Sequence, residues 1–271
     1  SEAAKALAAR GVKARALVRD ANKAAGLQAA GIELAVGDAT DAASVSKALA
    51  GCEKLLILLP NSQRQLELEK QMVDLAKAAG VRHVVKMSSM EAVADAKTPI
   101  PQGHWAAEEY IRKSGLAWTM MKPNFFMDNF LASARSIKEN KSFSLPMGNG
   151  TTAMADARDI GAATAEVLAG KGHEGKSYEI TGPELLTFHQ AAERFSEVLG
   201  TKITYVPADP EAYLGILKKI LAEWHANAVS QLFREIAEGV TPHTTDTFQK
   251  LVGRPPISLT QFIRDHIAAF R

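Results

Sequence analysis

Three groups of side chains in this sequence are suited to binding a small molecule. Arg19 carries a guanidinium group, whose forked donors match the oxygens of a phosphate. His104 has a reference pKa near neutrality, which makes it the best candidate for a proton donor. Phe125, Phe126 and Met127 are consecutive and can form an apolar wall against a flat ring. Side chains of these types are compatible with contacts to a phosphate and to a flat ring.

Each group also has a simpler explanation, which the sequence leaves open. Arg19 is compatible with a solvated position at the start of a helix, and His104 with a first-turn helix residue bonded to a loop. The aromatic pair is equally typical of a cluster between two lobes. The seven histidines are scattered without ligand spacing, so we expect no metal site.

The elements that must position these residues alternate through the first half of the chain. An opening helix at 1–10 ends at a glycine. Predicted strands follow at 12–18, 32–36, 54–59, 83–87 and 117–121, separated by predicted helices at 22–30, 41–49, 63–79 and 103–114. Such alternation is typical of βαβ units, so we predict an α/β fold with a parallel sheet.

The alternation stops near residue 127. Short strands are predicted at 142–145, 177–180 and 203–206, and the last sixty residues are mostly helical. We therefore expect a dinucleotide-binding domain at 1–126 and a smaller, mostly helical lobe at 127–271. Because no low-complexity linker separates them, both are expected to form one unit.

The opening helix has no strand before it. In a Rossmann-type doubly wound sheet of order 3-2-1-4-5-6, the first strand is central, and its removal leaves two buried edges unpaired. We therefore expect the gene to encode a further strand and a glycine-rich phosphate loop before Ser1. The predicted fold is a Rossmann-type sheet whose first strand and loop are missing from this sequence.

Composition limits the classes of partner. The 32 basic and 30 acidic residues give a net charge of +2 without long runs of one sign, so neither nucleic acid nor an anionic membrane is an expected partner. Cys52 is the only cysteine, which suits a reducing cytoplasm. The longest apolar run, 55–60, is too short to span a bilayer. The oligomeric state stays open, with a homodimer among the options.

Six segments, in this order and spacing, resemble the NmrA-like branch of the atypical short-chain dehydrogenase/reductases. The resemblance covers essentially the whole chain and extends to the bacterial NAD(P)H:quinone oxidoreductase and triphenylmethane-dye reductase members of this branch. The segments are ARALVRD (14–20), VGDATD (36–41), LLILLP (55–60), GVRHVVKMSS (80–89), HWAAEEYIRKSGLAWTMMKPNFFMDN (104–129) and GRPPISLTQFIRDH (253–266).

The resemblance implies where a nicotinamide dinucleotide binds. Arg19 would pair with a 2′-phosphate, which favours NADP(H) over NAD(H), and Asp38 would lie beside the adenine amino group. Asp38 is equally suited to a turn or a helix cap. Lys86 either approaches the cofactor or sits at the end of its strand. The segments Leu59-Pro60-Asn61 and Pro123-Asn124 would pass the cofactor, the first beside its pyrophosphate, although Asn61 is also a possible helix N-cap.

The resemblance also locates the catalytic groups. Typical short-chain reductases use a serine after the fifth strand and a Tyr-x-x-x-Lys on the next helix; here Ser88 or Ser89 takes the serine position. His104 occupies the tyrosine position and Glu108 the lysine position. Tyr110 lies about 200° around the helix from Glu108 and cannot substitute. No tyrosine–lysine pair is present, which puts a carbonyl-reductase mechanism in doubt.

The combined prediction is an NAD(P)H-dependent oxidoreductase that transfers hydride to a quinone-like or other electron-deficient aromatic acceptor. Such an acceptor needs orientation over the nicotinamide and a proton that water can supply. Phe125, Phe126 and Met127 would line the acceptor site, because the equivalent loop of the family lies against the nicotinamide. The alternative is a non-catalytic NAD(P)-binding redox sensor that acts through a protein partner. An isomerase acting on a nucleotide sugar is disfavoured, because such enzymes generally keep the tyrosine–lysine pair.

Overall fold

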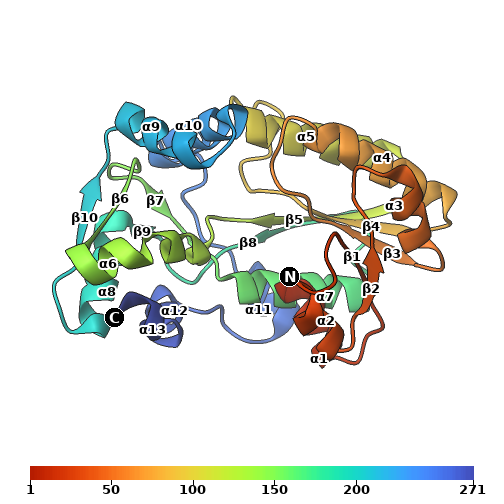
Figure 1. Ribbon diagram of the computed structural model, residues 1–271, viewed down its shortest axis with the longest axis horizontal. Coiled ribbons are helices and arrows are strands. Elements are labelled where there is room, and N and C mark those ends of the chain that lie inside the picture. Colours follow the sequence, from red (N-terminus) through yellow and green to blue (C-terminus); the bar gives the residue numbers. More distant parts are fainter.

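A parallel sheet in the order β3-β4-β5-β8 forms the centre of the molecule in a computed structural model that describes residues 1–271 (Figure 1). Lys86 of β4 lies beside Met120 of β5, and Met121 lies beside Tyr178 of β8. The predicted α/β fold with a parallel sheet is confirmed. The strands are β3 (Lys54–Ile57), β4 (His83–Met87), β5 (Ala117–Pro123) and β8 (Lys176–Ile180).

Helices cover both faces of this sheet, because side chains of each strand alternate between two cores. Val84 and Met120 pack with one set of helices, and Val85 and Met121 pack on the opposite face. The first set is α3 (Ala42–Leu49), α4 (Gln65–Ala78) and α5 (Pro99–Lys113); the second is α7 (Ala157–Ala169) and α11 (Thr247–Val252), and α1 (Glu2–Ala9) packs against α7.

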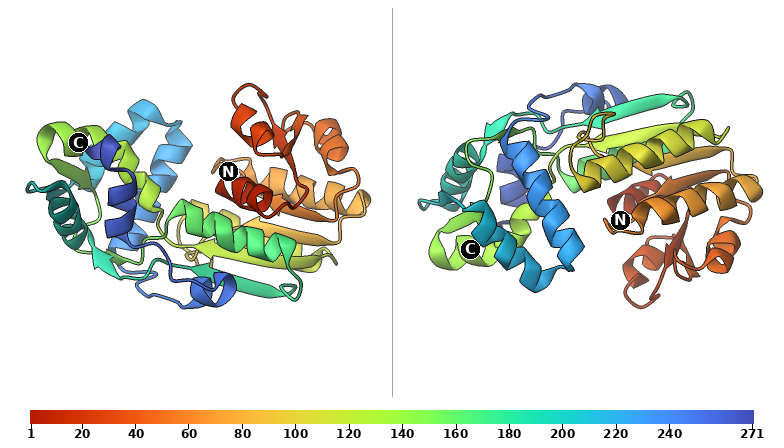
Figure 2. Two further views of the ribbon diagram at one scale, coloured as in Figure 1. Left: turned by 90° about the horizontal axis from the view of Figure 1, so that it is seen from below. Right: turned by 90° about the horizontal axis from the view of Figure 1, so that it is seen from above.

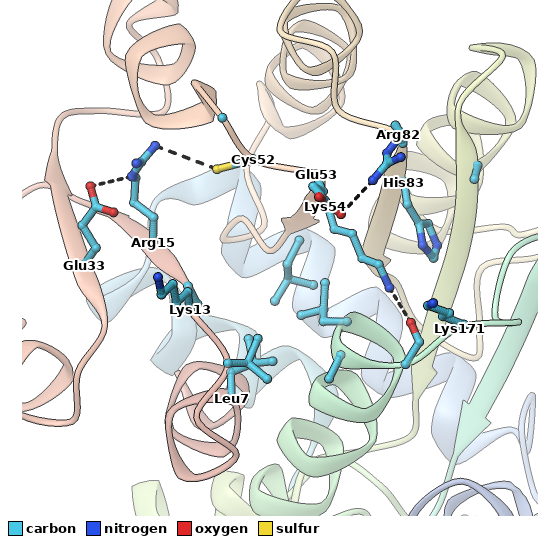
Figure 3. Close-up of a pocket in the computed structure, with 18 of the residues that line it drawn as sticks. Leu7, Lys13, Arg15, Glu33, Cys52, Glu53, Lys54, Arg82, His83 and Lys171 are labelled. Atoms are coloured by element: carbon cyan, nitrogen blue, oxygen red, sulfur yellow. Dashed lines mark hydrogen bonds and ion pairs between the residues drawn. The ribbon is translucent and has the colours of Figure 1, made fainter.

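Two further strands form a separate parallel pair. β1 (Arg15–Val18) pairs only with β2 (Glu33–Val36), and the short helix α2 (Ala25–Ala29) connects them. At the edge of the central sheet, β3 pairs only with β4. A cavity of about 1080 Å³ lies between the two sheets, and Figure 3 shows Arg15 on one side of it and Lys54 on the other. The order of a doubly wound sheet predicts another strand between these two edges, and that strand stays a prediction.

Most of the chain after residue 126 lies at the end of the molecule opposite β1, β2 and α3 (Figures 1 and 2), and this part is called the lobe. Its core is aromatic: the ring of Phe130 packs edge-on against Phe143 and Phe195, with centroids 5.3 and 5.2 Å apart. β6 pairs with β10 and β7 pairs with β9. The elements are η1 (Met127–Ser133), α6 (Ala134–Asn140), β6 (Ser142–Leu145), β7 (Thr151–Thr152), β9 (Leu186–Thr187), α8 (Phe188–Leu199), β10 (Thr204–Pro207), α9 (Pro210–Ile220), α10 (Glu223–Ala237), α12 (Leu259–Asp265) and α13 (Ile267–Phe270).

Two elements from beyond residue 126 belong to the sheet layer rather than to the lobe. β8 pairs with β5, and α7 packs against α1. The segment 127–271 therefore contributes to both layers, and the division at residue 126 stays a prediction. None of the helices combines the length and the apolar composition needed to cross a membrane.

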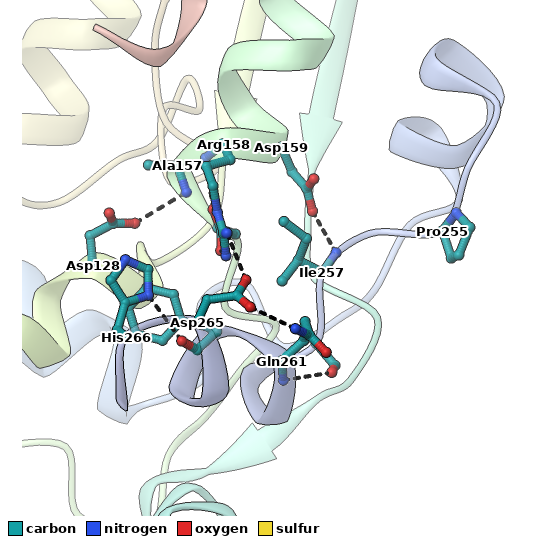
Figure 4. A network of polar contacts seen from close by, with 12 residues as sticks. Asp128, Ala157, Arg158, Asp159, Pro255, Ile257, Gln261, Asp265 and His266 are labelled. Atoms are coloured by element: carbon teal, nitrogen blue, oxygen red, sulfur yellow. Dashed lines mark hydrogen bonds and ion pairs between the residues drawn. The ribbon is translucent and has the colours of Figure 1, made fainter. Parts of the chain in front are cut away.

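A polar network attaches the C-terminal helices to the start of α7 (Figure 4). The buried Asp159 carboxylate accepts hydrogen bonds from Arg254 Nη2 at 2.7 Å and from the Ile257 backbone N–H at 2.6 Å. Arg158 bridges Asp156 and Asp265, with both distances 2.6 Å. Burial raises the pKa of Asp159, against the effect of its two donors. The charged partners keep this carboxylate satisfied inside the fold.

Candidate functional site

The carboxyl ends of the parallel strands carry most of the predicted site residues. In open α/β sheets, ligands bind outside this edge. Arg19 follows β1, and Ser88 follows β4. The large cavity between the sheets is not this site, because Lys13, Lys54 and His83 place it near the starts of β1, β3 and β4.

Arg19 and Asp38 follow neighbouring strands, since Val18 pairs with Val36. The exposed Arg19 guanidinium makes no hydrogen bond or ion pair with the protein. Asp38 accepts from the Thr40 N–H at 2.8 Å and from its hydroxyl at 2.7 Å. These bonds, and to a smaller extent the charge of Arg19, lower the pKa of Asp38. An unpaired guanidinium beside a satisfied carboxylate fits an anionic group such as a phosphate.

The loop after β3 begins earlier than expected. β3 ends at Ile57 rather than at residue 59, so Leu59, Pro60 and Asn61 all lie in the loop before α4. The residue that precedes α4 is Arg64, so the alternative role of Asn61 as a helix N-cap is wrong. The half-buried Asn61 amide makes no side-chain hydrogen bond within the protein. It remains available to a ligand.

A layer of buried charged side chains lies between the sheet and helices α4 and α5. Lys86 Nζ lies 2.7 and 2.6 Å from the two carboxylate oxygens of Glu69, and 3.3 Å from the Met87 carbonyl oxygen. Gln65 donates to the same carboxylate at 3.0 Å. Burial lowers the pKa of Lys86, against the charge of Glu69. The three donors of the ammonium are thus used within the protein, and the geometry gives Lys86 a partner other than a cofactor.

Ser88 and Glu108 belong to the same layer. The Ser88 hydroxyl lies 2.5 Å from Glu108 Oε1, and Lys122 Nζ lies 3.2 Å from the same oxygen. Arg112 Nη2 contacts Glu108 Oε2 at 2.7 Å. Glu108 is completely buried. The position that holds a lysine in typical short-chain reductases therefore holds a carboxylate with three donors around it.

His104 lies one turn before Glu108 on α5 and is 8% exposed. Its Nδ1 has no hydrogen-bond partner. Burial, followed by the charges of Lys86 and Lys122, lowers the pKa of His104 to about 3. Burial therefore moves His104 away from the reference pKa that made it the best candidate for a proton donor, and the imidazole is neutral at pH 7. His104 enters the site as a neutral ring with a free nitrogen.

The predicted apolar wall is located mostly in the lobe core. Phe125 packs edge-on against Phe188, with ring centroids 5.6 Å apart, and Met127 is 1% exposed in the same cluster. Phe126 is half-buried against the core beneath α7. For Phe125 and Met127 the structure thus favours the alternative explanation, an aromatic cluster, over a role as pocket wall.

The preceding residues are also engaged within the fold. Pro123 ends β5 and is buried. Asn124 Oδ1 accepts from the Thr152 hydroxyl at 2.6 Å and from the Phe125 N–H at 2.6 Å, while its Nδ2 lies 3.4 Å from the Thr241 carbonyl oxygen. This amide joins β5 to the lobe.

Three charged residues of this region were not predicted from the sequence. Glu69, Lys122 and Glu91 are all buried. Glu91 accepts from the Thr241 hydroxyl at 3.1 Å, and burial raises its pKa. One signal was available: Glu69 lies on the apolar face of a helix, four residues after Gln65, and a charged residue there needs a buried partner.

The comparisons with known proteins agree with this geometry. The NmrA-like family model matches residues 1–254. The chain belongs to the NmrA-like family. This NmrA-like chain is 34% identical over 259 residues to an NAD(P)H azoreductase of Xenophilus azovorans, covering 94% of this chain and 90% of the relative. It is 30% identical over 250 residues to quinone oxidoreductase 2 of Escherichia coli (strain K12), covering 92% and 87%.

Solved structures of NmrA-like proteins superpose on nearly the whole chain. The triphenylmethane reductase of Citrobacter sp. has a TM-score of 0.85 at 25% identity, and covers 98% of this chain and 95% of its own. The E. coli NADPH-dependent quinone oxidoreductase complexed with NADPH reaches 0.87 at 28% identity, with the same coverage. NmrA itself, a negative transcriptional regulator complexed with NAD, is 18% identical and shares the fold alone.

Three predictions are confirmed by these matches. The NmrA-like chain is an NAD(P)H-dependent reductase, and its cofactor is a nicotinamide dinucleotide. Its substrate is a small molecule.

Proposed function

We propose that this chain transfers hydride from NADPH to quinone-like or other electron-deficient aromatic acceptors. The observation that carries the proposal is the replacement of the tyrosine–lysine pair by His104 and Glu108. The imidazole of His104 is neutral at pH 7, and Glu108 accepts hydrogen bonds from three donors. Neither side chain is poised to protonate an acceptor, which favours acceptors that need no enzymatic acid.

Bound NADPH supplies two electrons and a hydrogen as hydride. For a quinone, hydride and one proton give the quinol and NADP⁺, and the proton comes from water. The protein then has to bind the cofactor and orient the acceptor, which accounts for much of the barrier reduction in such reactions. The names of the azoreductase, quinone and dye reductase relatives support this acceptor class.

The preference for NADPH rests on Arg19. Its guanidinium is exposed and unpaired after β1, where a doubly wound fold places the adenosine ribose. We assign it to the 2′-phosphate, and we assign Asp38 to the adenine side of the same region. Leu59, Pro60 and Asn61 are proposed to pass the pyrophosphate and the nicotinamide ribose.

The test is NADPH oxidation by the full-length protein against a panel of quinones, azo dyes and triphenylmethane dyes. We expect turnover with several of them. Absence of turnover across the panel, together with unequal affinities for NADP⁺ and NADPH, would instead support the redox sensor, because only differential binding can drive a switch.

A further inference from the structure

We propose that Glu108 binds the hydroxyl proton of Ser88 in a hydrogen bond, so that toward a substrate Ser88 can only accept. This arrangement disfavours simple ketones as substrates. Glu108 would then be a specificity-determining residue that acts through Ser88. This inference rests on the proposed function, because it explains which acceptors the same site selects.

The direction of the hydrogen bond follows from the partners of Glu108. Arg112 and Lys122, whose side chains can only donate, lie 2.7 and 3.2 Å from its two oxygens, so both oxygens act as acceptors. A carboxylate only accepts, so the Ser88 hydroxyl must donate across the 2.5 Å separation. A hydroxyl has one proton. The remaining capacity of the Ser88 oxygen is to accept a bond.

This polarity matters at the edge where Ser88 lies. Hydride addition to a ketone concentrates negative charge on one oxygen, and reductases stabilise that charge with an aimed donor. Ser88 directs its only proton to Glu108 instead. A quinone spreads the charge over its ring, and a cationic dye becomes neutral on accepting hydride. The transition states of these acceptors therefore lose little stabilisation when the serine donor is absent.

Glu108→Gln tests the proposal, with Glu109→Gln as a matched control. The substitution leaves one acceptor oxygen in place of two. The charged donors of Lys122 and Arg112 compete for that oxygen more strongly than the Ser88 hydroxyl does. The hydroxyl proton of Ser88 is then free to bond to a substrate. We expect the ratio of kcat/KM for an activated ketone to that for a quinone to rise about tenfold, below the full effect of one oxyanion donor. Glu109 is the next residue and also pairs with Arg112, at 2.9 Å, so Glu109→Gln should leave the ratio unchanged.

The gain must depend on the Ser88 hydroxyl. The double variant Ser88→Ala/Glu108→Gln should therefore return the ratio to its wild-type value. Ser88→Ala alone should change the ratio by less than about threefold, whereas a serine that donates to ketones would lower it by about 10²–10³-fold. A rise that persists in the double variant, or an equal rise in Glu109→Gln, would overturn the proposal.

An NMR measurement without turnover tests the same bond. We expect a slowly exchanging hydroxyl proton that is present in the wild type and in Glu109→Gln, and absent in Ser88→Ala. Its absence from the folded wild type would overturn the inference even if quinone turnover is normal. If no acceptor is turned over but this proton is present, the proposed function fails while the geometry of Ser88 stands. Equilibrium dialysis with NADPH confirms that each variant still binds the cofactor.

Discussion

The Lys86 ammonium and the Glu69 carboxylate form an ion pair with separations of 2.6 and 2.7 Å, and both side chains are at most 1% exposed. This pair joins β4 to α4 directly beneath the residues of the candidate site. In a buried pair of this kind, the desolvation of each ion is offset only by its partner.

We therefore expect removal of one partner to be costly. Glu69→Gln should lower the free energy of unfolding by about 3–5 kcal/mol, because it leaves the Lys86 charge buried without compensation. Urea denaturation at pH 7 measures the change. The exposed pair between Arg64 and Glu67 provides the control, since Glu67→Gln should have little effect. Similar midpoints for the two variants would show that the buried pair contributes no more than a surface pair.

Arg19→Ala tests the assignment of the 2′-phosphate. Loss of a charged hydrogen-bonded contact should weaken NADPH binding by about 1.5–3 kcal/mol and leave NADH binding nearly unchanged. Titration of both cofactors by fluorescence gives the two dissociation constants. Arg82→Ala, at the opposite end of the sheet, is the matched control. Equal losses for NADPH and NADH, or none for either, would make Arg19 a surface residue only.

His104 predicts a pH dependence of stability. Its folded pKa of about 3 lies below the usual value near 6.5, so below pH 6.5 the unfolded chain binds a proton that the folded chain does not. The contribution of His104 to the free energy of unfolding is therefore fully present above pH 6.5 and is lost as the pH falls toward 3. Between pH 7 and pH 5 it amounts to about 2 kcal/mol.

Urea unfolding of wild type and His104→Gln at both pH values isolates this contribution. Gln cannot titrate, so the stability loss between pH 7 and pH 5 should be about 2 kcal/mol smaller in the variant. The same loss in both proteins would show that His104 titrates normally in the folded state.

The order of strands and helices in the sheet layer could be predicted because it depends on local signals. Glycines end the helices, and the strands are short apolar runs such as 55–59. The buried charged layer could not be predicted in detail, because Glu69 and Lys86 meet only after the sheet and α4 have packed. The sequence also could not decide whether Phe125 lines a pocket or joins an aromatic cluster, because the contact with Phe188 that separates the two alternatives forms only when the chain has packed.

Two helical glycines are predicted to respond oppositely to substitution, because Gly161 lies at the contact between α1 and α7 and Gly215 does not. A Cβ at Gly161 would lie 2.6 Å from the carbonyl carbon of Glu2, which is backbone and cannot move aside cheaply. Gly161→Ala should therefore be destabilising by about 1–3 kcal/mol, the usual cost of overpacking. Gly215 lies within α9 in open space, and Gly215→Ala should stabilise by about 0.5–1 kcal/mol. Thermal melts of the two variants distinguish the effects; stabilisation by both would mean that α1 does not pack as described.

The central claim is that hydride transfer proceeds without a proton from the protein. Single-turnover reduction of a quinone, with NADPH or its 4-deuterated form in H₂O or D₂O, tests this directly. Deuterium at the transferred position should slow the reaction, whereas D₂O should leave the rate nearly unchanged, because neutral His104 and the Ser88 hydroxyl bound to Glu108 supply no proton in the transition state. A solvent isotope effect as large as the primary one, and lost in His104→Gln, would contradict the account.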